Sequence, residues 1–210
     1  IVLLMTFGLG QSDRFSSQNF FAYRRSEDQI NQILREDRLG VQSLRFQVLH
    51  GEWYTYLRGL FERYLIYFSP KMLFIEGDYS PRHSVPDLGV LLYISSLLIP
   101  FGVIYLLRNF GKGSILIFFW LIIAPLPAVF SRDLISMVRA LNLLLPLAIL
   151  EGAGLYYLIS ILKRFKKLWF YSLSAILFLA LGFNYLIFLD RYFIHAPKEN
   201  SAGWLYGYKD

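Results

Sequence analysis

Four apolar runs constrain the fold of this chain more than any other feature. Each is long enough for a helix rising about 1.5 Å per residue to cross a hydrocarbon layer of about 30 Å. Apolar residues make up 56% of the chain, and Glu151 is the one charged residue inside the runs. The sequence therefore predicts an all-α, polytopic transmembrane bundle. The predicted spans are Leu88–Leu107, Gly113–Phe130, Leu141–Leu162 and Leu168–Phe188.

The rest of the chain divides around these spans. Residues 1–9 are apolar but too short to cross a bilayer, and no charged region precedes them, so we interpret them as the end of a truncated transmembrane helix. Residues 10–87 form a long segment before the four transmembrane helices of residues 88–188. Residues 189–210 form a tail that we expect to lead to a missing C-terminal part.

The net charge of +6 lies in two short loops between spans. One loop contains Arg108 and Lys112, and the other contains four basic residues within Lys163–Lys167. The positive-inside rule assigns both loops to the cytoplasm, which places residues 10–87, 131–140 and 189–210 on the outer face. The basic excess reflects topology and forms no patch interleaved with aromatic residues, so we expect no nucleic-acid partner.

The outer segment has the pattern of amphipathic helices. Ser26 followed by Gln29 is a capping box, and apolar residues at helical spacing follow until Gly40. Aromatic and aliphatic residues recur at helical spacing from Trp53 to Phe68, before Pro70. A helix so rich in aromatic residues suits a lipid interface, but an ordinary helix packed on the outer domain has the same pattern.

Two outer loops carry polar residues next to span entrances. The first contains Asp78, Arg82 and His83, and the second contains Arg132 and Arg139. Arginine and histidine can donate to an anion such as phosphate. The alternatives are a local Asp78–Arg82 ion pair that fixes the turn, and a snorkelling role for Arg139.

Glu151 lies near the middle of its span, beside two glycines. An ionisable residue at this depth is a candidate functional residue, although a protonated acid could also hydrogen-bond within a helix contact. The chain has no cysteine, which excludes disulfides and thiolate metal sites. No Asp, Glu or His spacing suggests a shell for a divalent cation, so we predict no metal and no cofactor.

Three stretches carry a resemblance to a known family. They are YLIYFSPKMLFIEGDYSPRHSVPDLG, FFWLIIAPLPAVFSRDLISMVRALNLLLPLAILEGAGL and DRYFIHAPKENSAGWLYGYKD. In this order they resemble bacterial membrane glycosyltransferases of the dolichyl-phosphate-mannose protein mannosyltransferase type, within the C-type glycosyltransferase superfamily. The resemblance covers most of residues 45–210.

This resemblance implies transfer of a sugar from a polyprenyl-phosphate donor at the outer face of the bacterial plasma membrane. An acceptor hydroxyl attacks the anomeric carbon, a base takes the hydroxyl proton, and the lipid phosphate leaves. In the family that base is an acidic residue of a first outer loop near the N-terminus, which this sequence does not contain, so the catalytic residue is unknown.

The resemblance also implies roles for particular residues. Arg82, His83 and Arg139 are the candidates for binding the donor phosphate, and Asp78 would orient Arg82. His195 and Lys198, after the last span, are candidates for the acceptor side, although both could be solvated loop residues.

Two other classes of protein remain open from the sequence. A polytopic secondary transporter would have a substrate site near the midplane, with Glu151 at its centre. A structural membrane subunit is the third possibility. The outer segment of about 75 residues favours the transferase, because ordinary loops between spans are much shorter.

Overall fold

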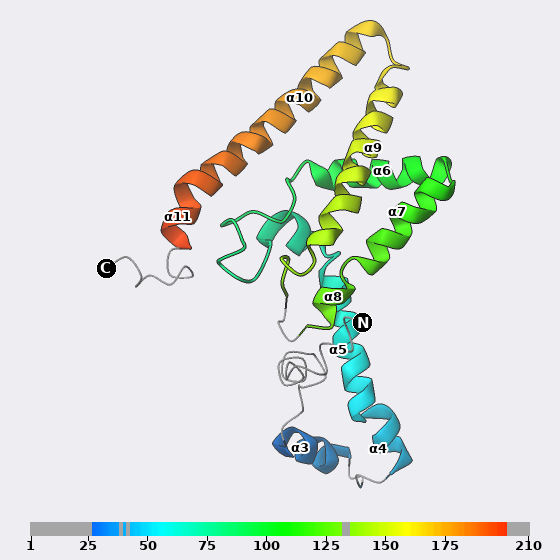
Figure 1. The fold of residues 1–210 in the computed structure, drawn as a ribbon, viewed down its shortest axis with the longest axis vertical. Helices are drawn as coiled ribbons and strands as arrows, with labels where there is room; N and C mark the ends of the chain where they lie inside the picture. Colours follow the sequence, from blue (N-terminus) through cyan, green and yellow to red (C-terminus); the bar gives the residue numbers. More distant parts are fainter. Residues whose placement is uncertain (1–26, 38–39, 41–42, 132–134, 201–210) are drawn as a thin grey trace, which may run out of the picture. The chain divides into compact units, whose positions relative to one another are not determined.

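The computed structural model describes residues 27–37, 40, 43–131 and 135–200 (Figure 1). Every regular element in this part of the chain is a helix, which confirms the predicted all-α class. The chain forms two compact units, residues 1–65 with 127–134 and residues 66–126 with 135–210. The predicted helix end at residues 1–9 and the candidate Arg132 lie outside the described residues.

The first unit contains the amphipathic helices of the outer segment. The sequence predicts two of them, which the structure confirms as α3 (Glu27–Asp37) and α5 (Glu52–Ile66). A third helix, α4 (Leu44–Leu49), lies between them, and the Ser43 hydroxyl caps it by accepting from the Phe46 N–H at 3.2 Å. On α5, Arg63 is buried and donates to the Ser131 carbonyl oxygen, which fixes the rotation of the helix within this unit.

Three helical stretches of the described residues are long and apolar enough to cross a membrane. They contain, in order, α7 (Lys112–Ile123) with α8 (Leu126–Val129); η3 (Leu141–Leu143) with α9 (Leu144–Leu162); and α10 (Lys167–Asp190) with η4 (Arg191–His195) and α11 (Ala196–Glu199). These stretches agree with three of the four predicted spans.

The first predicted span, Leu88–Leu107, is wrong over its first third. Helix α6 (Ser95–Arg108) has 14 residues, about 21 Å of helix, which falls short of a bilayer core. The preceding apolar residues instead run along the short helix η2 (Lys71–Glu76), where the Leu91 N–H donates to the Leu73 carbonyl oxygen at 2.8 Å. This stretch is therefore bonded to η2 through its backbone and does not form the start of a spanning helix.

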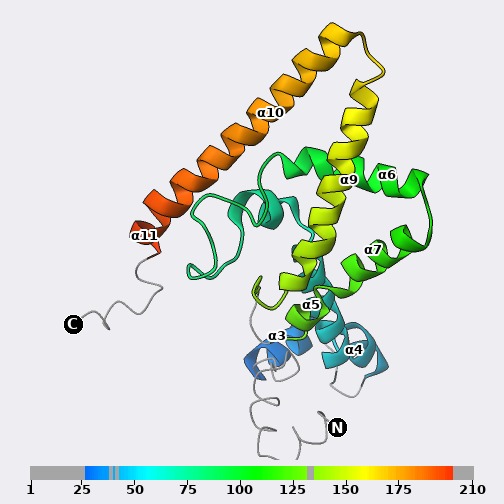
Figure 2. The same ribbon diagram turned by 45° about the horizontal axis from the view of Figure 1, so that its top comes forward.

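Helices α6 and α9 cross each other (Figures 1 and 2), and two glycines lie at the crossing. A Cβ atom on Gly102 would collide with the Leu150 carbonyl oxygen, and one on Gly154 would collide with the Leu98 carbonyl oxygen. The two backbones are thus in direct contact, which is how small residues allow membrane helices to approach each other. Among the described helices, α6 and α9 form the most extensive pairwise contact.

Candidate functional site

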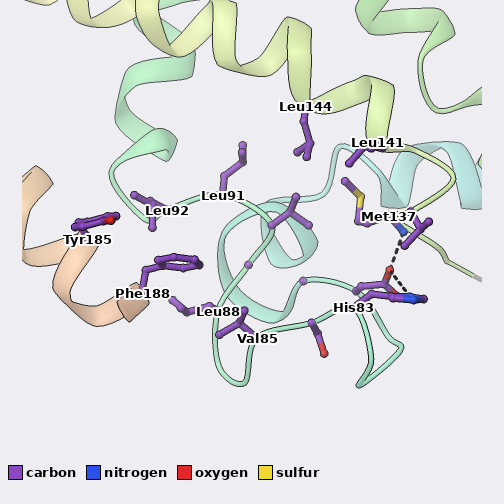
Figure 3. Close-up of a pocket in the computed structure, with 16 residues that line it drawn as sticks. His83, Val85, Leu88, Leu91, Leu92, Met137, Leu141, Leu144, Tyr185 and Phe188 are labelled. Carbon is purple, nitrogen blue, oxygen red and sulfur yellow. Dashed lines mark hydrogen bonds and ion pairs between the residues drawn. The ribbon is translucent and has the colours of Figure 1, made fainter. Parts of the chain in front are cut away.

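A cavity of about 460 Å³ opens in the second unit beside the first outer loop (Figure 3). Its walls are mostly apolar, with Leu141 and Leu144 from the start of the α9 stretch and Tyr185 and Phe188 from α10. The polar side chains at its edge belong to Asp78, His83 and Ser84. An apolar cavity with a few polar groups at one edge is typical of a small-molecule site.

Asp78 is the structural centre of the polar edge. Its side chain is 1% exposed, and its carboxylate accepts from the Ser80 N–H at 2.9 Å and from the Met137 N–H at 2.7 Å. These two hydrogen bonds compensate for the burial of the charge. Gly77, with φ of +71°, provides the turn that brings Asp78 to this position directly after η2.

His83 lies against the Asp78 carboxylate. Its Nδ1 atom is 3.9 Å from Asp78 Oδ2, a contact drawn as a dashed line in Figure 3. The His83 side chain is 40% exposed. The backbone turn Ser80–Ser84 holds the ring there, with the His83 N–H donating to the Ser80 carbonyl oxygen at 2.9 Å. Because Nδ1 is directed at the carboxylate, Nε2 is the nitrogen left to serve a ligand.

The second outer loop is anchored next to Asp78. Tyr67 is completely buried, and its hydroxyl accepts from the Ser136 N–H at 3.0 Å. The next residue, Met137, donates its N–H to Asp78. The backbone N–H groups of Ser136 and Met137 are therefore both bound by side chains. Tyr67 precedes the first outer loop, and Asp78 belongs to it.

Helix α10 is attached to the other side of the first loop by polar contacts. Arg191 forms an ion pair with Asp87 at 2.8 Å, and the Asn200 side chain donates to the Ser84 carbonyl oxygen at 2.8 Å. The Asn184 side-chain oxygen accepts from the Ile94 N–H at 3.3 Å. These contacts place Tyr185 and Phe188 in the wall of the cavity.

Of the predicted phosphate ligands, His83 lines the cavity, whereas Arg82 and Arg139 are not among the described residues that line it. Arg82 is exposed and precedes His83 in the same turn, while Arg139 is exposed and follows Met137 by two residues. The Asp78–Met137 hydrogen bond joins the two loops from which the arginines extend. For Asp78 the structure shows a contact with His83, and the predicted orientation of Arg82 stays a prediction.

His195 and Lys198 differ from their predicted setting. The sequence predicts a loop after the last span, but the chain stays helical from α10 through η4 and α11 to Glu199. His195 lies between two carboxylates of this stretch, 3.4 Å from an oxygen of Asp190 and 3.4 Å from one of Glu199. Neither His195 nor Lys198 is among the described residues that line the cavity.

Glu151 lies away from the lining of this cavity, on α9. Its Oε1 atom is buried and has no hydrogen-bond partner among the described residues. Within the same residues, no group of three or more His, Asp or Glu side chains is arranged to hold a metal ion.

Sequence reasoning missed the apolar half of the site. Tyr185, Phe188, Leu141 and Leu144 all lie inside predicted spans, where almost every residue is apolar. A uniform apolar pattern does not indicate which residues face a cavity and which face lipid.

Comparison of the chain with protein-family models, curated proteins and solved structures found no match.

Proposed function

We propose that this chain belongs to a membrane glycosyltransferase that moves a sugar from a polyprenyl-phosphate donor to an acceptor hydroxyl. The proposed reaction takes place at the outer face of the bacterial plasma membrane. The observation that carries the proposal is the Asp78–Met137 hydrogen bond, which joins two arginine-bearing loops at the edge of an apolar cavity. An isoprenoid phosphate has the same division into a long apolar chain and one anionic group.

In this proposal the polar edge binds the donor phosphate. The phosphate gains charge as its bond to the anomeric carbon breaks, and positioned donors stabilise that charge. Arg82 and Arg139 supply guanidinium forks, and His83 supplies the Nε2–H of an imidazole. The cavity walls, with Leu144 and Phe188, contact the first part of the isoprenoid chain.

Asp78 acts as a positioning residue in this scheme. Its carboxylate is buried and already accepts two backbone N–H groups, so it is poorly placed to take a proton from an acceptor. Its contact with His83 orients the imidazole. The general base that deprotonates the acceptor hydroxyl is a different residue, which the proposal leaves unassigned.

Binding of a polyprenyl phosphate to the purified protein in nanodiscs tests the proposal. We expect Arg82→Ala and Arg139→Ala each to weaken binding by about tenfold or more, since each removes charge-assisted hydrogen bonds. Lysine at either position should recover only part of the affinity, because an ammonium group cannot form a bidentate fork. Leu144→Trp should also weaken binding by filling the cavity.

Lys163→Ala is the matched control, since Lys163 is a basic residue at the opposite end of α9. Unchanged affinity in both arginine variants, or an equal loss in Lys163→Ala, would contradict the proposal. The proposed orientation is checked in intact cells with a membrane-impermeant maleimide. Tyr79→Cys should react, whereas Gly113→Cys should react only after the membrane is permeabilised.

A secondary transporter is the alternative, and Glu151 is the observation that favours it. A buried carboxylate oxygen without a hydrogen-bond partner in a span is an arrangement found in proton and ion pathways. In a transporter, Glu151→Gln would abolish substrate uptake into proteoliposomes, and Arg82→Ala would leave it intact. If the protein is a glycosyltransferase, Arg82→Ala should reduce sugar transfer more than Glu151→Gln does.

A further inference from the structure

Helix α5 exposes a continuous apolar face. Trp53, Leu57, Phe61 and Leu65 are 53%, 57%, 63% and 49% exposed, and each follows the previous one by four residues. At about 100° per residue they cover an arc of about 120° on the helix. Exposed Tyr54 lies within the same arc. An apolar stripe this wide normally faces a partner or a membrane.

The rest of α5 is polar or anchored within its own unit. Arg63, on the side away from the arc, is buried and donates to the Ser131 carbonyl oxygen. Arg58 and Glu62 border the arc, form an exposed ion pair at 2.8 Å, and do not interrupt the stripe. The helix therefore cannot turn its apolar arc inward without breaking the Arg63 contact.

Helix α4 extends the apolar surface. Leu44 is 79% exposed and Val48 is 51% exposed, and both line one shallow hollow together with Trp53. The Trp53 indole N–H donates to the Gln47 carbonyl oxygen at 2.9 Å, which fixes the ring at the end of α4. The exposed apolar residues of α4 and α5 thus form one patch on two short helices.

Length and composition decide what covers this patch. Helix α5 has 15 residues, about 22 Å, and carries charges, so it cannot cross a bilayer core of about 30 Å. Helices that lie in the membrane interface typically carry tryptophan, tyrosine and phenylalanine next to charged residues. The same chain has three helical stretches long and apolar enough to cross a bilayer, which makes a bilayer the natural surface for this patch.

The residue that follows α5 contacts a residue close in sequence to a candidate span. Its last residue, Ile66, precedes Tyr67, whose hydroxyl binds Ser136. Ser136 is five residues before Leu141, where the second candidate span begins. We propose that α4 and α5 lie at the boundary between headgroups and acyl chains of a phospholipid bilayer, with Leu57 and Phe61 in contact with acyl chains.

Nitroxide labelling tests this proposal in the full chain, which has no cysteine of its own. Leu57→Cys, Phe61→Cys and the control Glu62→Cys are labelled and reconstituted into vesicles with equal parts phosphatidylethanolamine and phosphatidylglycerol. Collision with oxygen, which concentrates in lipid, is compared with collision with a water-soluble nickel chelate. We expect oxygen to dominate at Leu57 and Phe61 and the nickel chelate to dominate at Glu62.

Either of two other labelling results would overturn the proposal. Strong nickel collisions at all three positions would place the patch in water. Weak collisions with both reagents at Leu57 and Phe61 would mean that protein covers the patch. Dilution of the labelled chain with unlabelled chain would then show whether that protein is a second copy. These positions are exposed, so labelling leaves the core intact.

An unlabelled measurement provides a second, independent check. We expect brominated phospholipid to quench a tryptophan signal that Trp53→Phe removes, and absence of such a signal would also overturn the proposal. Neither measurement uses a sugar donor, so the results are independent of the proposed transferase activity.

Discussion

Helices α9 and α10 follow each other in the chain and are similarly apolar, yet they are packed in different ways. Helix α9 buries Leu147, Leu150 and Gly154, and its backbone touches α6. Along α10, Leu177 is the one buried residue, and a Cβ on Gly182 would meet nothing within 4 Å. Hydropathy indicates that both helices tolerate lipid, but the positions of small residues decide which of them packs closely.

The contacts that hold α10 are correspondingly polar and lie toward its C-terminal end. Asn184, Arg191 and Asn200 connect this stretch to the loop that carries the candidate site. Backbone contact thus stabilises α9 against α6, whereas hydrogen bonds attach α10 to the loop. If this comparison is right, equivalent substitutions on the two helices should have very different costs.

The largest effect is expected at the glycine crossing. Gly154→Ala places a methyl group against the Leu98 carbonyl oxygen, a backbone atom that cannot move without displacing α6. We expect a loss of about 3 kcal/mol in the free energy of unfolding, at the upper end of overpacking costs. Thermal unfolding of the protein in detergent measures this loss.

Gly152→Ala and Gly182→Ala are the matched controls, since a Cβ at either position meets open space. Both should be neutral or slightly stabilising, because alanine has the higher helix propensity. Equal destabilisation by Gly152→Ala and Gly154→Ala would show that the α6–α9 contact is not specific to Gly154.

An intermediate effect is expected at Asn184. Asn184→Leu removes the acceptor for the Ile94 N–H, at a cost of about 1 kcal/mol for one hydrogen bond. Hydrogen exchange should become faster at Ile94 and nearby loop amides. Asn109→Leu is the control, because the Asn109 side chain donates only locally, to the Tyr105 carbonyl oxygen. An unchanged hydrogen-exchange rate at Ile94 in the Asn184→Leu variant would mean that this hydrogen bond does not attach α10 to the loop.

The smallest effect is expected at the Arg191–Asp87 ion pair. Asp87 is 73% exposed, so water and salt screen the attraction. Arg191→Ala should lower the free energy of unfolding by about 0.5 kcal/mol or less. The difference from the unsubstituted protein should vanish at high salt in thermal unfolding. A large loss that persists at high salt would place this pair among the main attachments of α10.

The polar half of the candidate site could be identified from the sequence because its residues are unusual for their setting. Asp78 and His83 stand in a loop with glycine and proline next to a long apolar run, and the structure places both at the edge of a cavity. Their partners could not be identified. The Met137 amide is 59 residues from Asp78, and a backbone N–H carries no sequence signal.

The sequence by itself determined that the chain is helical and that three long stretches can cross a membrane, because lipid requires long apolar segments with internal hydrogen bonds. Only the tertiary structure decided the use of Leu88–Leu91, which are bonded to η2 through the Val90 and Leu91 amides and line the cavity. It also decided which glycines carry the helix crossing and which aromatic residues face the cavity. The physical reason is that hydrophobicity is non-directional, whereas backbone contact and hydrogen bonds depend on geometry between residues far apart in the chain.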